Sequence, residues 1–177
     1  AAQKTEIVPA YYKGTHSGHD VYGIADGAGS WMNASPDAHN EYVREVNAKH
    51  SGQVKKLIRY VKAWKYFRDV PISSFYLEMR IARYCEDQKS ILYHYDIPFI
   101  LRRLLNADLA AMQDPMGISG YINACKSPAL KADALSKLQT AVNRSEAALE
   151  AAKNDDLYTA FERWRMLYGE GFPSYYY

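Results

Sequence analysis

The stretch between residues 53 and 78 constrains the fold of this chain more than any other. Its first half, QVKKLIRYVKAWKYF, repeats apolar residues at spacings of three and four, which lays one apolar stripe along an α-helix. Pro71 then ends this helix, because proline cannot continue it and favours extended geometry in the residue before it. Ser73 and Ser74 follow, and a serine hydroxyl can cap the first turn of a second helix. The pattern predicts a helical hairpin.

The side of the first helix away from its apolar stripe is basic. Six cationic side chains lie there: Lys55, Lys56, Arg59, Lys62, Lys65 and Arg68. Lysines, a serine-led helix N-terminus and the ring of Phe75 together offer charges and amides for phosphates and a ring face for a base. On the pattern alone, a solvated basic face and a core position for Phe75 are the more common interpretation. Both interpretations stay open at this point.

Composition places the chain among ordinary globular proteins. Its 177 residues are enough for one substantial core, and a net charge of +2 does not suggest a general nucleic-acid coat. Cys85 and Cys125 have neither metal nor redox spacing, so we expect buried free thiols in a reducing cytoplasm. The sequence has no long apolar run and no signal peptide, so we expect no membrane partner.

The N-terminal part of the chain reads as strands and turns. Residues 4–12 are rich in β-formers and predict a strand that ends at Pro9. Residues 13–35 are rich in glycine and predict turns around a short strand at 21–24. A strand cannot stand alone, so these residues need partners. Because the chain starts inside such a pattern, we expect it to be a fragment.

A metal cluster of His16, His19 and Asp20 is an alternative for this glycine-rich part. The spacing is loose and no other donors follow, so a flexible loop is the favoured interpretation.

The remainder of the chain reads as helices. Ser35 and Pro36 open a helix with a good capping pattern, and a structural hydrogen bond is the favoured role for its His39. Pro98 either lies in a first turn or kinks a longer helix. We predict helices at 36–49, 91–112, 127–153 and from 157 to Gly169, with an extended connection at 114–126. The predicted fold class is mainly α, a helical bundle with a short N-terminal β part.

Three motifs resemble one known superfamily. The sequence RYVKAWKYFRDVPISSFYLEM at 59–79 resembles the lysine helix and the following serine-aromatic helix of the template-independent nucleotidyltransferases. The pattern of proline, histidine, valine and asparagine in 36–47 resembles their long bridging helix, and EIVPA at 6–10 resembles a metal-binding strand. The superfamily includes 2′-5′-oligoadenylate synthetase, animal cyclic GMP-AMP synthase and the bacterial cGAS/DncV-like enzymes (CD-NTases). The hairpin is the most specific of the three motifs.

The resemblance implies roles for five residues. Lys62 would contact the donor triphosphate, Ser74 would hydrogen-bond phosphate or ribose, and Phe75 would stack on a base. Lys65 is a weaker candidate for nucleotide binding. Glu6 would be the third carboxylate of the catalytic metal site, at a position where the family usually has aspartate.

The resemblance also implies what this chain lacks. Nucleotidyl transfer in the superfamily uses two Mg²⁺ ions held by carboxylates. The sequence contains no Gly-Ser turn followed by Asp-x-Asp or Glu-x-Asp, and only Glu6 can be matched. One carboxylate cannot hold two divalent ions, so we expect this chain alone to be inactive. Residues 1–35 would be remnant strands of a catalytic core, residues 36–177 the helical substrate-binding domain, and a missing N-terminal catalytic segment their partner.

Two functions from different classes follow. The first is the C-terminal nucleotide-binding part of an enzyme that makes cyclic or linear oligonucleotide second messengers from nucleoside triphosphates in anti-phage defence, as the resemblance implies. The alternative is a helical interaction module whose basic hairpin binds a protein partner or RNA; nucleic acid is not the favoured partner. A metal-dependent hydrolase built on His16 and His19 is a distant third.

Overall fold

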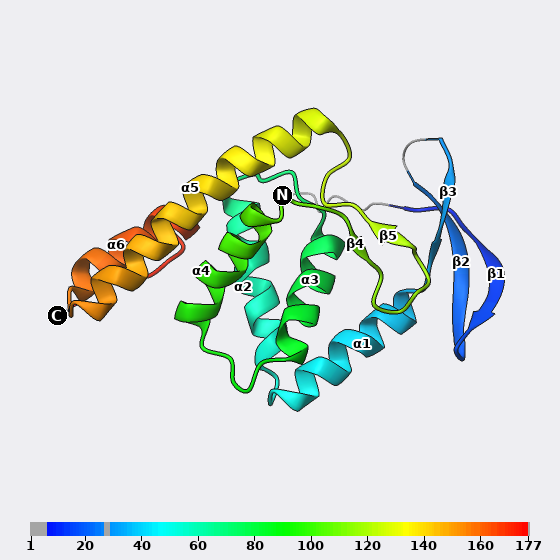
Figure 1. Cartoon of the computed structure of the whole chain (residues 1–177), viewed down its shortest axis with the longest axis horizontal. Coiled ribbons are helices and arrows are strands. Elements are labelled where there is room, and N and C mark those ends of the chain that lie inside the picture. The colour runs from blue at the N-terminus through cyan, green and yellow to red at the C-terminus, as the bar shows by residue number, and fades with distance from the viewer. Residues whose placement is uncertain (1–6, 27–28, 177) are drawn as a thin grey trace.

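The computed structural model describes residues 7–26 and 29–176, and most of these residues are helical (Figure 1). The predicted mainly α fold class is confirmed. The helices of the described residues are α1 (Pro36–Lys49), α2 (Gln53–Phe67), α3 (Ser74–Glu86), α4 (Tyr93–Asn106), α5 (Pro128–Lys153) and α6 (Leu157–Tyr168). The strands are β1 (Ala10–His16), β2 (His19–Ala25), β3 (Trp31–Ala34), β4 (Met112–Gln113) and β5 (Tyr121–Ile122).

The three N-terminal strands form an antiparallel sheet at one end of the molecule (Figure 1). The predicted boundary at Pro9 is wrong: residues 7–9 have no regular structure, and β1 starts at Ala10 and continues to His16. The glycines in these strands weaken the sequence pattern that predicts strands. A Cβ at Gly23 of β2 would lie 2.5 Å from the ring of Tyr11, so the ring can cover the strand only where no side chain projects.

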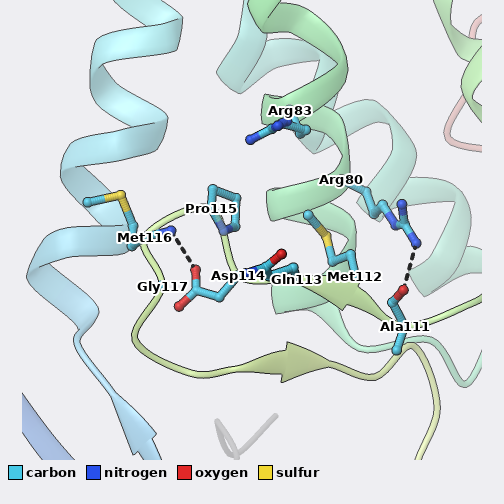
Figure 2. Close-up of a pocket in the computed structure, with 9 residues that line it drawn as sticks. All are labelled: Arg80, Arg83, Ala111, Met112, Gln113, Asp114, Pro115, Met116 and Gly117. Atoms are coloured by element: carbon cyan, nitrogen blue, oxygen red, sulfur yellow. Dashed lines mark hydrogen bonds between the residues drawn. The ribbon is translucent and has the colours of Figure 1, made fainter.

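The segment after α3 differs most from its prediction. The predicted helix at 91–112 spans only Tyr93 to Asn106, with Pro98 inside it. Asp108 and Leu109 then adopt positive φ values of 49° and 47°, which end the helix. Met112 instead begins β4, which pairs with β5 inside the predicted extended connection (Figure 2).

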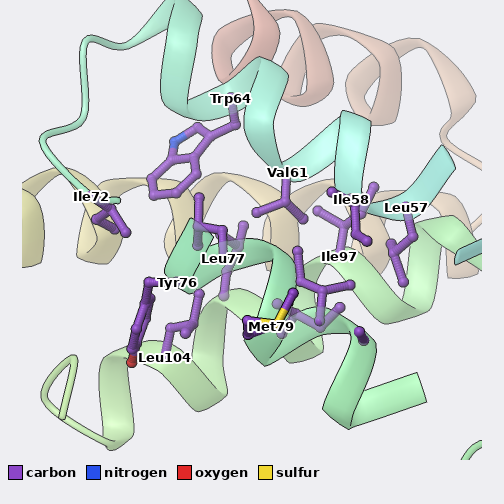
Figure 3. Packing of buried hydrophobic residues seen from close by; sticks show 14 of the residues in the cluster. Leu57, Ile58, Val61, Trp64, Ile72, Tyr76, Leu77, Met79, Ile97 and Leu104 are labelled. Atoms are coloured by element: carbon purple, nitrogen blue, oxygen red, sulfur yellow. The ribbon is translucent and has the colours of Figure 1, made fainter. Parts of the chain in front are cut away.

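The helical hairpin predicted at 53–78 is confirmed, and its second helix continues to Glu86. The apolar stripe of α2 is buried against the other helices (Figure 3), and α3 packs against both α1 and α2. The hydroxyl of Ser73 caps α3 by accepting from the amide of Tyr76 at 3.3 Å. Burial of an apolar side chain contributes about 1.5–3 kcal/mol, so this stripe fixes where the two helices face one another.

The end of α2 is anchored on the end of α6. The guanidinium of Arg68 donates to the carbonyls of Leu167 and Arg165, at 3.0 and 3.3 Å. These carbonyls belong to the last turn of α6, and that of Arg165 also accepts the amide of Gly169 at 2.7 Å. Burial, together with the charge of Arg144, lowers the pKa of Arg68. The long α5 packs against α6 and α4, so the two-helix arm α5–α6 joins the bundle through fixed contacts.

Both cysteines are free thiols, as predicted. Cys85 is buried in α3, and burial raises the pKa of its thiol to about 12. Cys125 is half-buried.

Candidate nucleotide-binding site

Lys62 projects from the flank of α2 toward α3. Its Nζ lies 2.5 Å from Oε1 of Glu78, and each side chain is 35% exposed. The amine is therefore already paired, at a position that solvent and a ligand can reach. A pair so exposed stabilises a protein by only about 0–1 kcal/mol, so an incoming anion can replace Glu78 at low cost.

Ser74 and Phe75 lie in the first turn of α3, one turn before Glu78 of this ion pair. Glu78 follows them by four and three residues, and residues at these spacings are neighbours on a helix surface. Both side chains are half-buried rather than sealed in the core. Ser74 and Phe75 are thus surface neighbours of Glu78, the partner of Lys62. What each binds stays a prediction.

Ser73 and Ser74 occupy different positions at the start of α3. Ser73 uses its hydroxyl to cap the helix, and its amide donates to the carbonyl of Ala124 at 2.7 Å. Ser74 is the first residue of the helix itself. The free amides of a first helical turn attract anions, so Ser74 lies where a phosphate would meet both a hydroxyl and the positive end of the helix.

Lys65 lies one turn beyond Lys62 and is half-buried. Because α2 and α3 form a hairpin, this turn is closer to the start of α3 than Lys62 is. Lys65 thus remains a candidate for a second phosphate contact.

Phe75 is held from the side of α1. The rings of Phe75 and His39 meet edge to face, with centroids 4.8 Å apart and planes at 75°. His39 is buried, and its Nε2 lies 3.0 and 2.9 Å from the two carboxylate oxygens of Asp114. The predicted structural hydrogen bond of His39 is confirmed.

The carboxylate of Asp114 organises the loop that follows β4. It accepts the backbone amides of Met116, Ile118 and Ser119 at 2.7–3.0 Å, in addition to His39. Burial by itself would raise the pKa of Asp114, but the amide of Ser119, the ring of His39 and the amide of Met116 hold the pKa below its usual value. Asp114 is therefore ionised at neutral pH, and the Nε2–H of His39 donates to it.

A hollow of about 630 Å³ opens beside this loop (Figure 2). It is lined by Arg80 and Arg83 of α3 and by residues 111–117. Arg80 is committed to the protein, because its guanidinium donates to the hydroxyl of Tyr76 and the carbonyl of Ala110. Arg80, held by these hydrogen bonds, thus lines the same hollow as Asp114.

Sequence reasoning missed Asp114 as a neighbour of the site. An aspartate before Pro-x-Gly is a recognisable turn signal, since its carboxylate accepts amides a few residues on. Its partner His39 is 75 residues away in the chain, and no local pattern joins the two.

Neither metal hypothesis is matched by a complete set of ligands among the residues that the structure describes. Among residues 7–26 and 29–176, no group of three or more histidine, cysteine, aspartate or glutamate side chains could hold an ion. His19 instead lies 3.3 Å from Glu41 of α1. Glu6, the carboxylate matched to the magnesium site, lies outside the described residues. The described residues do not by themselves form a magnesium site.

Two solved bacterial structures share the fold of most of this chain. A structure of the Vibrio cholerae dinucleotide cyclase DncV with ATP and GTP matches 85% of this chain and 40% of its own, with a TM-score of 0.65 and 18% identity. The Escherichia coli MS115-1 CdnC structure with ATP matches 94% of this chain and 60% of its own, with a TM-score of 0.73 and 14% identity.

A curated relative gives the same relationship at the sequence level. A probable cyclic nucleotide synthase of Bacillus cereus (strain VD146) is 28% identical over 185 residues, covering 96% of this chain. The chain spans about half the length of that relative, 52%. No protein-family model matches the chain. The predicted relationship to the bacterial CD-NTases is confirmed.

None of the helices in the described part of the chain is long and apolar enough to cross a membrane.

Proposed function

We propose that this chain is the nucleotide-binding, helical part of an enzyme that joins nucleoside triphosphates into cyclic or linear oligonucleotide second messengers in anti-phage defence. The observation that carries the proposal is the partly exposed Lys62–Glu78 pair, in which Glu78 follows Ser74 and Phe75 by four and three residues on α3. Two further findings support it. The curated relative is named a probable cyclic nucleotide synthase, and the similar DncV and CdnC structures contain ATP, with GTP also present in DncV.

In this proposal the triphosphate replaces Glu78 as the partner of Lys62. The amine exchanges one carboxylate for a polyanion of higher charge, which is favourable at a partly exposed position. The hydroxyl of Ser74 and the amides of the first turn of α3 bind a further phosphate or the ribose. Lys65 supplies a second positive charge.

The base stacks on Phe75. Such a stack is worth about 1–3 kcal/mol and accepts any base, so it holds ATP and GTP alike. The proposal therefore assigns the chain to nucleotide binding and leaves the choice of base to contacts outside this ring.

Bond formation belongs to the rest of the enzyme in this proposal. The sequence contains no Gly-Ser turn followed by the Asp-x-Asp or Glu-x-Asp pair of the superfamily, and Glu6 is the one matched carboxylate. We expect the N-terminal catalytic segment of the full enzyme to complete the Mg²⁺ site, and this chain alone to bind nucleotides without joining them.

Calorimetric titration of the chain with ATP, GTP and inorganic tripolyphosphate tests the proposal. We expect saturable binding of all three, and we expect Lys62→Ala to weaken all three by about 10- to 150-fold, since a charge-assisted contact is worth about 1.5–3 kcal/mol. Phe75→Ala should weaken only the two nucleotides. The matched control is Lys56→Ala, because Lys56 is exposed about 120° around the same helix. Absence of saturable ATP binding, or equal effects of the two lysine variants, would contradict the proposal.

The alternative, an RNA- or protein-binding face, is favoured by the exposed cations on α2. Lys55, Lys56 and Arg59 are all exposed, whereas Lys62 is paired with Glu78. Binding that grows with RNA length and falls steeply with salt would support this alternative, because each phosphate contact releases counterions. Loss of that binding in Lys55→Ala or Arg59→Ala, with Lys62→Ala unaffected, would assign the function to the exposed face.

A further inference from the structure

We propose that His39 and Asp114 are positioning residues for the nucleobase: they hold the ring of Phe75 in the orientation in which a base stacks on it. Neither residue would touch the nucleotide. This inference rests on the proposed function, because it concerns the same site.

The contact between His39 and Phe75 is directional. The two rings meet at 75° with centroids 4.8 Å apart, the edge-to-face arrangement that aromatic pairs prefer. His39 comes from α1 and Phe75 from the first turn of α3, so the contact ties the ring to a second helix. Phe75 packs against the hydrophobic core but is only half-buried, so part of the residue stays exposed to solvent.

The orientation of His39 is fixed in turn by Asp114. Nε2 of His39 lies within 3.0 Å of both oxygens of the carboxylate, so the imidazole cannot turn about its χ2 without losing a charge-assisted hydrogen bond. Asp114 is 3% exposed and also accepts three backbone amides of its own loop. A buried carboxylate with four donors is a fixed point, and rigid support of this kind positions a binding side chain.

The order of contacts runs from the loop at 114–119 through His39 to Phe75. A purely structural role for the His39–Asp114 pair would lower stability and leave ligand affinity alone. A positioning role instead lowers affinity only for ligands that carry a base, since the triphosphate is bound by other residues. The two roles therefore differ in a measurable way.

His39→Gln is the variant that separates them. The amide nitrogen of glutamine can reach the carboxylate as Nε2 does, so Asp114 keeps its donor while Phe75 loses the ring edge. We expect ATP and GTP to bind about two- to tenfold more weakly, the value of an aromatic pair, and tripolyphosphate to bind unchanged. Asp114→Asn should have the same selective effect.

His50→Gln is the matched control. Its Nε2 lies 2.7 Å from the carbonyl of Cys85, so it also joins the end of α1 to α3, but at the other end of α3 from Phe75. We expect all three ligands to bind to this variant as to the unmodified chain.

A double-mutant cycle completes the test. In the Phe75→Ala background, His39→Gln should change ATP affinity no further, because the ring that it orients is gone. The inference is overturned if His39→Gln leaves ATP affinity unchanged while Phe75→Ala lowers it, if tripolyphosphate affinity falls equally, or if the two substitutions add in full. Failure of the unmodified chain to bind ATP would instead overturn the proposed function, so the two failures are distinguishable. If Asp114→Asn does not fold, His39→Gln decides the test alone.

Discussion

The helix α3 is held differently on its two sides. Toward α1, the ring of Phe75 contacts His39. The imidazole of His39 is hydrogen-bonded to the carboxylate of Asp114, which is 3% exposed and also accepts backbone amides of its own loop. Toward α2, Glu78 meets Lys62 in a single pair that is about one-third exposed. The first arrangement is costly to disturb, and the second is easily exchanged for a ligand. A site that binds and releases nucleotides needs both, a fixed surface for the base and an exchangeable charge for the phosphates.

The largest effect should come from the buried side. Asp114→Ala leaves His39 and three backbone amides without their acceptor, so we expect the free energy of unfolding to fall by about 3–5 kcal/mol. Urea denaturation followed by circular dichroism measures this. Glu78→Ala is the matched removal of a carboxylate on the exchangeable side and should cost less than about 1 kcal/mol. Equal losses of unfolding free energy in the two variants would show that the two sides of α3 do not differ in stability.

Low pH should destabilise the protein through the same buried side of α3, where Asp114 lies. Because the folded-state pKa of Asp114 is lowered, its contribution to stability is complete above its unfolded pKa of about 3.9 and is lost as the pH falls through the folded value. We expect the unfolding free energy of the unmodified chain to decrease below about pH 4 more steeply than that of Asp114→Asn. Identical pH profiles for the two proteins would show that this carboxylate is not the one that acid titrates.

The smallest effect should come from the exchangeable side. Glu78→Gln removes the carboxylate that competes with phosphate for Lys62, so we expect ATP and tripolyphosphate to bind about two- to fivefold more tightly, or up to ~1 kcal/mol. Isothermal titration calorimetry at low salt resolves such a change. Glu86→Gln serves as control, since that carboxylate pairs with Arg83 at the far end of α3. Weaker binding in Glu78→Gln would mean that Glu78 orients Lys62 rather than competing for it.

The sequence predicted the α2–α3 hairpin because its signals are local. The apolar stripe of α2, the break at Pro71 and the serine cap lie within one continuous segment, and each acts on residues a turn or two away. The predicted hairpin therefore carries Lys62 on one helix and Ser74 and Phe75 at the start of the next. Their roles came from resemblance and stay predictions.

The fixed side could not be predicted, because it forms only on folding. His39 and Asp114 are 75 residues apart, and neither α1 nor the loop after β4 carries a pattern that specifies the other. The same limit applies to the β4–β5 pairing and to the early end of α4, where the buried Leu109 continues an apolar spacing after the helix has stopped. Tertiary burial, rather than local preference, decided these segments.

A structure of the chain with ATP bound tests the account most directly. We expect adenine against the ring of Phe75, the triphosphate at the amine of Lys62, and the Lys62–Glu78 pair broken, with the His39–Asp114 bond unchanged. Binding of ATP in the hollow beside Arg83, with Lys62 still paired to Glu78, would contradict it.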